Sequence, residues 1–462
     1  MDRRTFILGT GTGLGSYLGR AEGQLGTRPG TADKQASTTL IRGATVFDSE
    51  RMLLRRNHSV LMRDGRIVAV GSGGDLQAPA DAVVLDARGK YVIPGLIDAH
   101  VHLTHILYHS RMTGDEILPF FLAHGITAVR GAGDNVPAQR LVQRYAERYP
   151  HLAPRIFMAS FLIDGQPPHH PDIGWALTSP DDVPAFVEHM AGWDVTTLKL
   201  YIKCDRSVGS RVIEEGHAHG LRVAGHLGDY RPADASDDGI DSLEHIYTIA
   251  DFIRADPNDR HTVDLESDEA GRLIDTLANN GTAVAPTLMV FWGTLFFVDV
   301  AEVIEHPDND AMPARLLAFW HEDNPRRLES FSSGLLSVRR NTFETYKRLT
   351  GRLHSAGVRI LVGTDAPEPQ VPPGSSLHHE MELLVESGLS PAEVLSAATL
   401  HNAEVLRAQQ ELGSVSVGKR ADMVLLDANP LNAIANTRRI HRVIRGGRVL
   451  EPREILAAAP RN

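Results

Sequence analysis

Hydrophobic and polar residues alternate in short stretches near both ends of the chain, after a first segment without such a pattern. Alternation with a period of two predicts β-strands. They are expected over residues 40–47, 59–62, 67–70, 83–85 and 91–93, and again over residues 422–426, 442–444 and 448–450. The C-terminal strands are too few for a stable sheet of their own. We therefore predict that residues 39–93 and 413–453 pair into one small composite β-sandwich domain.

Between these ends, over residues 94–412, short apolar runs alternate with longer amphipathic stretches that predict helices, for instance over residues 181–190 and 207–219. After a first strand that ends near residue 102, strands are predicted over residues 126–130, 155–159, 197–202, 222–226, 241–245, 282–287 and 359–363. Eight strand–helix units in succession predict an α/β fold, a (β/α)8 TIM-like barrel with its active site at the carboxyl ends of the strands. Residues 290–353 exceed one unit and are expected to add helices over that site.

The first 38 residues resemble a targeting segment. Arg3 and Arg4, followed by a weakly apolar, Gly-rich stretch to Gly19, are typical of a twin-arginine export signal. Residues 20–38 are rich in Gly, Ala, Thr and Gln and predict a disordered linker. The segment predicts an exported, periplasmic protein. The alternative is a cytoplasmic protein with a disordered tail.

Composition excludes several classes of function. The 462-residue chain has a net charge of −11 and an isoelectric point near 6.0, which argues against nucleic acid or an anionic membrane as a partner. No run of about 18 apolar residues is present, so no membrane span is expected. The single cysteine, Cys204, excludes an internal disulfide and a Cys-rich zinc site. We expect a small-molecule substrate and, because barrels often associate, a homo-oligomer.

Several residues that can bind a metal lie at the ends of the predicted central strands. Side chains two apart in a strand point the same way, so His100 and His102 are expected to face one pocket. Four further candidates follow at later strand ends: Lys199, His226, His245 and Asp365. One histidine alone would more often be a core or surface residue, but this convergence predicts a two-metal hydrolytic site. Imidazole and carboxylate ligands without thiolate suit Zn, with Mn, Co or Fe as alternatives.

A series of motifs around these residues resembles a known family. The chain contains, in order, PGLIDAHVH, GITAVR, LKLY, VAGHL, SLEHI, VAPTL, VGTDAP, GSSLHHEMELL and VGKRADMVLLD. Together they resemble the amidohydrolase superfamily, in particular its imidazolonepropionase-like and Xaa-Pro dipeptidase-like branch, over residues 39–450. The resemblance implies a metallo-barrel with a composite β-sandwich, in agreement with the strand pattern.

The resemblance also implies a role for each candidate ligand. His100, His102 and Asp365 would hold a first divalent ion, and His226 and His245 a second. Lys199 would bridge both ions as a carbamate formed with carbon dioxide, because a free ammonium cannot ligate whereas a carbamate offers two anionic oxygens. Lys203 lies on the same strand face, and a Lys199 salt bridge without carbamate is the alternative. Asp365 would be catalytic, taking a proton from the attacking water and passing it to the leaving amine.

Five other residues are candidates for binding the substrate, each with a structural alternative. Arg130 could contact a carboxylate or form an internal ion pair, and His170 lies in a Pro-rich loop that could reach the substrate or only solvent. Tyr230 could donate a hydrogen bond to the substrate. His378 and His379 could touch the substrate or only orient the metal ligands.

The sequence leaves several reactions open. The leading prediction is hydrolysis of an amide bond in a small substrate such as a dipeptide or N-acyl amino acid. A mononuclear deaminase or cyclic-amidine hydrolase is a second possibility, although such a site has no need of Lys199. An ester, lactone or phosphotriester hydrolase would use the same two-metal site. A non-catalytic binding barrel is the least favoured, because all six ligands are present.

Overall fold

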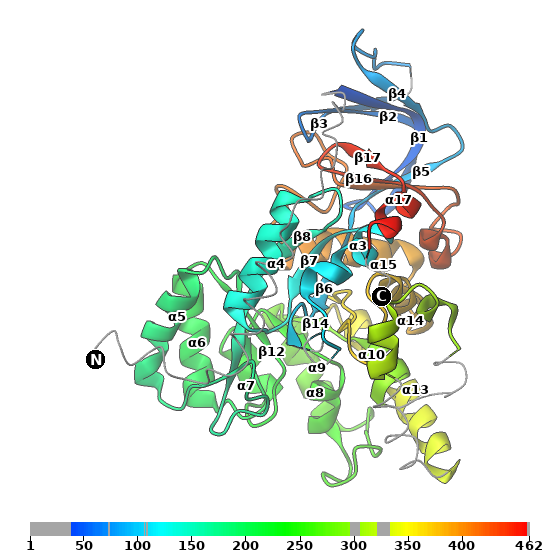
Figure 1. The fold of residues 1–462 in the computed structure, drawn as a ribbon. Helices are drawn as coiled ribbons and strands as arrows, with labels where there is room; N and C mark the ends of the chain where they lie inside the picture. Colours follow the sequence, from blue (N-terminus) through cyan, green and yellow to red (C-terminus); the bar gives the residue numbers. More distant parts are fainter. Residues whose placement is uncertain are drawn as a thin grey trace.

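The chain folds into two regions that lie end to end (Figure 1). The structure, a computed structural model, describes residues 38–459 apart from 73, 106, 108–109, 296–304 and 321–332. A β-sheet built from both chain ends, the composite sheet, lies at one end of the molecule. The central region, residues 95–412, contains parallel strands and most of the helices. The predicted export signal and almost all of the linker lie outside the described residues.

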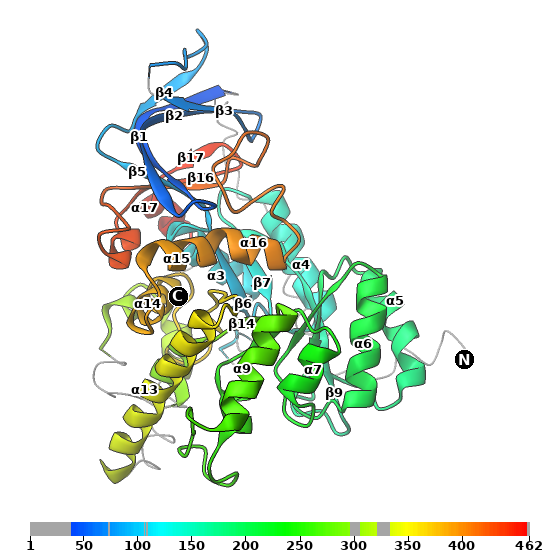
Figure 2. The same cartoon turned by 180° about the vertical axis from the view of Figure 1, so that it is seen from behind.

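The composite sheet has eight strands in the order β17-β16-β15-β5-β1-β2-β3, with β4 paired to β1. Its strands are β1 (Thr38–Asp48), β2 (Leu53–Arg63), β3 (Arg66–Ser72), β4 (Val83–Asp86), β5 (Tyr91–Pro94), β15 (Met423–Leu426), β16 (Ile440–Arg445) and β17 (Arg448–Leu450). Strands β5 and β15 pair antiparallel, which joins the two chain ends. Blue and red strands therefore lie side by side in Figures 1 and 2.

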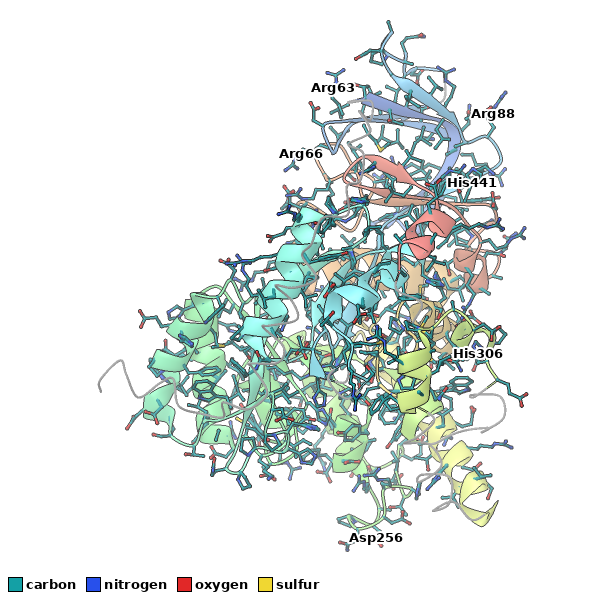
Figure 3. The ribbon with its side chains drawn as sticks, viewed as in Figure 1. Arg63, Arg66, Arg88, Asp256, His306 and His441 are labelled. Atoms are coloured by element: carbon teal, nitrogen blue, oxygen red, sulfur yellow. The ribbon has the colours of Figure 1, made fainter. Side chains whose placement is uncertain are left out.

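The strands are hydrogen-bonded into one sheet that bends on itself, and the sandwich arrangement of this domain stays a prediction. The bend lies in β1, where the register with β2 shifts near Ala44 and Gly43 adopts a φ of 73°. The first half of β1 pairs with β4 and the second half with β5. The bent sheet encloses its own core, a buried cluster that includes Val60 of β2 together with Met423 and Leu425 of β15. Arg63, Arg66 and Arg88 project from its outer surface (Figure 3).

The central strands are parallel and lie in two sheets. One contains β6 (Leu96–Val101), β7 (Ile126–Gly131) and β8 (Arg155–Phe157). The other has the order β10-β9-β11-β12-β13-β14, formed by β9 (Ala159–Asp164), β10 (Gly174–Ala176), β11 (Thr197–Leu200), β12 (Arg222–Gly225), β13 (Ser242–Glu244) and β14 (Ala283–Ala285). Seven of the eight predicted strands thus recur with ends shifted by a few residues, and β9 and the short β10 are additional.

The two sheets do not form a closed eight-stranded barrel among the described residues. The strand predicted over residues 359–363 is present only as an isolated bridge between Ile360 and Val284 of β14. A second bridge joins Val101 of β6 to Ala366. Asn402 occupies further backbone groups here, because its side chain bonds to the backbone of Ile97 and Val362. The same segment also bonds through its backbone on both sides, because Leu361 N donates to Val284 O at 2.8 Å and Ala99 N donates to Val362 O at 3.0 Å.

Helices surround the central strands (Figure 2). They are α3 (Gly114–Ala123), α4 (Val136–Arg148), α5 (Val183–Ala191), α6 (Arg206–Ala218), α7 (Pro232–Asp237), α8 (Tyr247–Ala250), α9 (Asp268–Asn280), α10 (Leu288–Val290), α13 (Ser333–Ser355), α14 (Ser375–Glu386), α15 (Pro391–Ser396), α16 (Asn402–Val405) and α17 (Pro452–Ala457). Asn135, Asp205 and Ser267 cap α4, α6 and α9 by accepting a hydrogen bond from the first turn. None of the described helices combines the length and apolar character that a membrane span requires.

Candidate active site

A cavity of about 190 Å3 opens at the carboxyl ends of the central strands. It is lined by His100, His102, His105, Ala132, Leu162, His170, Ile173, Lys199, Tyr201, His226, His245, Tyr247, Val290, Asp365 and Glu368. All six predicted metal ligands are in this group. The cavity therefore brings these six residues together from five separate segments of the sequence.

The backbone turns sharply at three of the strand ends around this cavity. His245 has a φ of 66°, Thr287 a φ of 48° and Asp365 a φ of 68°. Residues with side chains rarely adopt this left-handed conformation, and when they do they are concentrated at functional sites. The turn at His245 places its side chain in the cavity, whereas Glu244 before it points into the protein interior.

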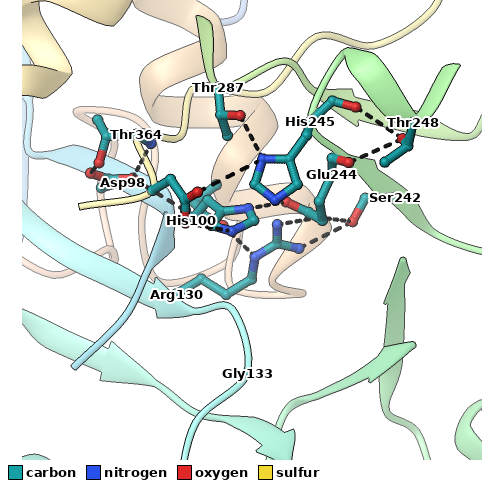
Figure 4. Close-up of polar contacts among 12 residues, drawn as sticks. Asp98, His100, Arg130, Gly133, Ser242, Glu244, His245, Thr248, Thr287 and Thr364 are labelled. Carbon is teal, nitrogen blue, oxygen red and sulfur yellow. Dashed lines mark hydrogen bonds and ion pairs between the residues drawn. The ribbon is translucent and has the colours of Figure 1, made fainter. Parts of the chain in front are cut away.

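His100 and His102 use one ring nitrogen each for a buried partner, and Figure 4 shows His100 beside Glu244. The Nδ1 of His100 lies 2.6 Å from Glu244 Oε2, and the Nδ1 of His102 donates to the carbonyl oxygen of Gly133 at 3.0 Å. The Nε2 atoms of the two rings lie 3.3 and 3.1 Å from Asp365 Oδ1. Neither approach has hydrogen-bond geometry, and both His100 Nε2 and Asp365 Oδ1 are buried without a hydrogen-bond partner.

His226 and His245 also use one ring nitrogen each for a protein partner, but His245 uses Nδ1 and His226 uses Nε2. His245 Nδ1 lies 2.7 Å from Thr287 Oγ1, whereas His226 uses Nε2 for a short contact with the Tyr247 hydroxyl. Their ring centroids are 4.5 Å apart, and His245 is 4.7 Å from His100. A metal-binding histidine usually bonds a protein group through its second nitrogen. Each of the four imidazoles therefore has one nitrogen fixed by a neighbour and one left for an ion.

Asp365 is anchored by the residue before it. Asp98 of β6 is fully buried and accepts from the Thr364 hydroxyl at 2.7 Å and the Thr364 amide at 3.1 Å. Burial acts to raise the pKa of Asp365, but the surrounding imidazoles, led by His100, hold it well below its ordinary value. His100, His102 and Asp365 can each offer one ligand atom, and these atoms lie within 4.8 Å of one another.

Lys199 lies at the floor of the cavity and is only 2% exposed. Its Nζ has no hydrogen-bond partner, and burial lowers its pKa to about 8. A buried amine that is partly neutral and unpaired can react with carbon dioxide, which suits a carbamate. Lys203, the alternative, is outside the cavity and donates to the Pro167 carbonyl at 2.8 Å.

Arg130 does not reach the cavity, in contrast to the expected substrate contact. It is 1% exposed and donates to Ala99 O, Ser242 Oγ and Glu244 Oε1 at 2.5, 3.2 and 2.6 Å. Burial raises the pKa of Glu244, but Arg130, Lys199 and His100 together hold it well below its ordinary value. The carboxylate of Glu244 thus connects Arg130 to the metal-ligand candidate His100, which corresponds to the ion-pair alternative.

Three other expected substrate contacts also lie away from the cavity. Tyr230 donates to Asp238 at 2.7 Å, so its hydroxyl points toward the helix side of β12. His378 is fully buried between Thr437 and the carbonyl of His124. His379 packs against Trp292, with ring centroids 4.4 Å apart. His170 does line the cavity, where its Nε2 lies 3.1 Å from the Tyr201 hydroxyl.

The cavity contains functional groups that the sequence reading missed. Tyr201 is two residues after Lys199 and therefore shares its face, a spacing that could have revealed it. Tyr247 is in the short helix after His245, where no periodicity marks it. Glu244 is adjacent to His245 in the sequence, but its link to His100 depends on residues 144 positions apart. Glu368 lines the cavity from the loop after Asp365.

The residues present fit a pair of divalent ions. The cavity offers four imidazole nitrogens, a carboxylate and a buried unpaired amine, which are nitrogen and oxygen donors of the kind that Zn prefers. Only the group around His100 has its ligand atoms close together in this structure, whereas Lys199, His226 and His245 line the same cavity.

The chain is similar to known proteins over most of its length. The model of the amidohydrolase family matches residues 91–450. An imidazolonepropionase from Brevibacillus brevis is 23% identical over 432 residues, covering 80% of this chain and 83% of that protein. A Xaa-Pro dipeptidase with bound methionine superposes with a TM-score of 0.67 at 20% identity, covering 90% of this chain and 100% of that one. A bottromycin amidohydrolase superposes with a TM-score of 0.73 at 22% identity, covering 98% of this chain and 95% of that one. These structures imply a TIM-like barrel fold for the central region.

Proposed function

Since the chain belongs to the amidohydrolase family and is a hydrolase acting on carbon–nitrogen bonds, we propose that it cleaves an amide bond of a small substrate with the help of two divalent ions. The substrate would be a compound such as a dipeptide or an N-acyl amino acid. Zn suits the donor set best, and Mn, Co or Fe are alternatives. His100, His102 and Asp365 would hold one ion, and His226 and His245 would hold the other. A carbamate on Lys199 would be a ligand of both ions.

One observation carries this proposal. The four histidines proposed as ligands each have one ring nitrogen engaged by a fixed partner, namely Glu244, the Gly133 carbonyl, Tyr247 or Thr287. Such partners set the tautomer of an imidazole and leave its other nitrogen unprotonated for an ion. A cluster of histidines without a metal role would need no such consistent arrangement.

The proposed chemistry divides the work between the ions and the chain. Two bound ions would lower the pKa of a shared water toward about 7 and polarise the substrate carbonyl. Asp365, whose carboxylate is held at the centre of the cavity, would take the proton of the attacking water and deliver it to the leaving amine. The apolar wall formed by Leu162, Ile173 and Val290 would hold the carbon chain of the substrate and exclude water.

Two other reactions compete with amide hydrolysis. An ester, lactone or phosphotriester hydrolase would use the same groups, because the same water can attack either centre. A mononuclear deaminase or cyclic-amidine hydrolase would need only the group around His100. The buried, unpaired Lys199 favours the binuclear alternative, since a one-metal site gives this amine no role.

Metal analysis combined with a substrate screen tests the proposal. The full chain is reconstituted with Zn or Mn in bicarbonate, and bound ions are counted by plasma mass spectrometry. We expect two ions per chain and hydrolysis within a library of dipeptides, N-acyl amino acids, esters and lactones. One ion per chain with release of ammonia from amidines would instead support the mononuclear alternative.

A further inference from the structure

The Tyr247 side chain is held rigidly over the second half of the cavity. Its ring stacks on His245 at 5.8 Å with an interplanar angle of 22°, and the edge of Phe291 contacts it at 5.7 Å. Its hydroxyl contacts His226 Nε2, and the residue lines the cavity. Both histidines are candidates for the same ion, so this phenol lies inside the cavity beside the proposed site of the second ion.

The hydrogen bond between His226 and Tyr247 has a fixed direction once His226 binds an ion. A neutral imidazole has one proton, and the nitrogen that ligates cannot carry it. Since Nε2 faces Tyr247, the ion would take Nδ1 and the proton would lie on Nε2. His226 then donates and the Tyr247 oxygen accepts.

This direction leaves the phenolic proton of Tyr247 for another acceptor. A tyrosine hydroxyl has one proton and is protonated at neutral pH, since its ordinary pKa is about 10. The proton cannot point toward His226, which already donates along that line. Within the described part of the chain, no second hydrogen-bond partner of this hydroxyl is found. The acceptor must therefore come from the contents of the cavity.

Tyr201, the other phenol in the cavity, differs in this respect. Its ring also packs against His226, with ring centroids 4.6 Å apart, but its hydroxyl lies 3.1 Å from His170 Nε2. Tyr201 therefore has a protein partner that can accept its proton. Of the two phenols, Tyr247 is the one whose proton is directed to the substrate.

We propose that Tyr247 is a catalytic residue that donates a hydrogen bond to the carbonyl oxygen of the scissile bond as negative charge develops on it. The proposal rests on the proposed function, because it requires an ion on His226. A fixed donor aimed at a developing oxyanion stabilises the transition state more than the bound substrate. Tyr247 thus acts mainly on turnover, and less on substrate binding.

The test compares Tyr247→Phe with Tyr230→Phe in the metal-loaded full chain. Tyr230 is a matched control, because it is a buried tyrosine whose hydroxyl bonds Asp238 outside the cavity. Loss of one oxyanion donor costs about 10²–10³-fold in kcat, so we expect this loss for Tyr247→Phe with a smaller change in KM. Methylphosphonate, a tetrahedral oxyanion, should inhibit Tyr247→Phe at least about tenfold more weakly than the wild type. Tyr230→Phe should match the wild type in all three quantities.

Metal counts separate the possible failures. Two ions per chain in Tyr247→Phe with the expected losses support the proposal. Two ions with kcat and methylphosphonate inhibition near wild type overturn it. Loss of one ion also overturns it, because Tyr247 would then serve only to hold His226. A wild type that binds no ions or hydrolyses nothing in the library refutes the proposed function itself, whereas an active wild type with an unaffected Tyr247→Phe refutes only the role of Tyr247.

Discussion

The composite sheet and the cavity bury their residues in opposite ways. In the sheet, the fully buried residues are apolar ones such as Val60, Val92 and Leu425, which pack on each other. In the cavity, the buried residues are ionisable ones such as His100 and Lys199, at 1% and 2% exposure. Burial of apolar surface stabilises a fold, whereas burial of an unpaired amine or imidazole costs free energy. The sheet thus contributes stability and the cavity contributes reactivity.

Asp365→Asn should have the largest effect of the substitutions, and this effect should be on turnover and not on stability. The amide is nearly isosteric, so the fold is retained, but it cannot accept a proton from water. General acid–base catalysis contributes about 10²–10⁴-fold, and we expect kcat to fall by that factor. Turnover and bound metal must be measured on the same sample. A fully metallated variant with near wild-type turnover would contradict the proton-transfer role and would leave His170 as the next candidate within the cavity.

Leu425→Ala in the composite sheet should show the reverse pattern. Leu425 is fully buried in β15, and truncation of a buried leucine costs about 2–5 kcal/mol of stability. We expect denaturant unfolding to shift by this amount while kcat per folded molecule stays unchanged. A loss of turnover in the fully folded variant would show that the sheet also shapes the cavity and would break the division between the two regions.

Lys199→Met tests the difference between the two regions directly, because it replaces a buried amine in the cavity with an apolar side chain of the kind that is buried in the composite sheet. Burial lowers the pKa of Lys199 from 10.5 to about 8, so between these pH values the unfolded chain binds one proton more than the folded chain. Stability of metal-free, carbon dioxide-free protein therefore rises over this interval, by about 3 kcal/mol. Lys199→Met should lack this rise, be more stable at pH 7, and lose activity. Parallel unfolding curves of both proteins at pH 7 to 10.5 would contradict the prediction.

Thr287→Val should have the smallest effect, by loosening one metal ligand. Without the Thr287 hydroxyl at 2.7 Å, His245 loses the partner that fixes its tautomer. Loss of such a partner typically weakens metal affinity about 10–100-fold, which a competitive chelator titration would measure. Thr437→Val is the matched control, since Thr437 bonds His378 at 2.9 Å outside the cavity. Equal metal affinity in both variants would contradict the role of Thr287.

The sequence predicted the candidate ligands more successfully than the substrate contacts. Alternation along strands gives the face of each residue, so the joint position of His100, His102 and Lys199 followed from local pattern. The same pattern cannot show which face meets which distant element. Arg130 ends a strand as predicted, yet its partner Glu244 is 114 residues away. Tyr230 and His379 were wrongly predicted to contact the substrate for the same reason. Tyr230 bonds Asp238 and His379 packs on Trp292, and these tertiary contacts cannot be read from a local pattern.

The outline of the fold was also predictable, but its closure was not. Seven central strands were located because each is a short apolar run between helices. The segment around Ile360 has the same composition and bonds through its backbone to Val284 and Ala99, yet it forms only isolated bridges, and Asn402 adds side-chain bonds to Val362. In the composite sheet, the bend in β1 depends on a bulge at Ala44, which hydrophobic alternation does not indicate.

The pairing of β5 with β15 has a consequence for synthesis of the chain. The chain leaves the sheet at Pro94 and returns in the neighbouring strand at Met423, so the entire central region is an insertion between adjacent strands. A ribosome adds about 5–20 residues per second, so β5 waits on the order of half a minute for its partner. During that interval the edge of β5 is an open template for other chains. The nascent catalytic region therefore has time to fold before the two ends of the protein meet.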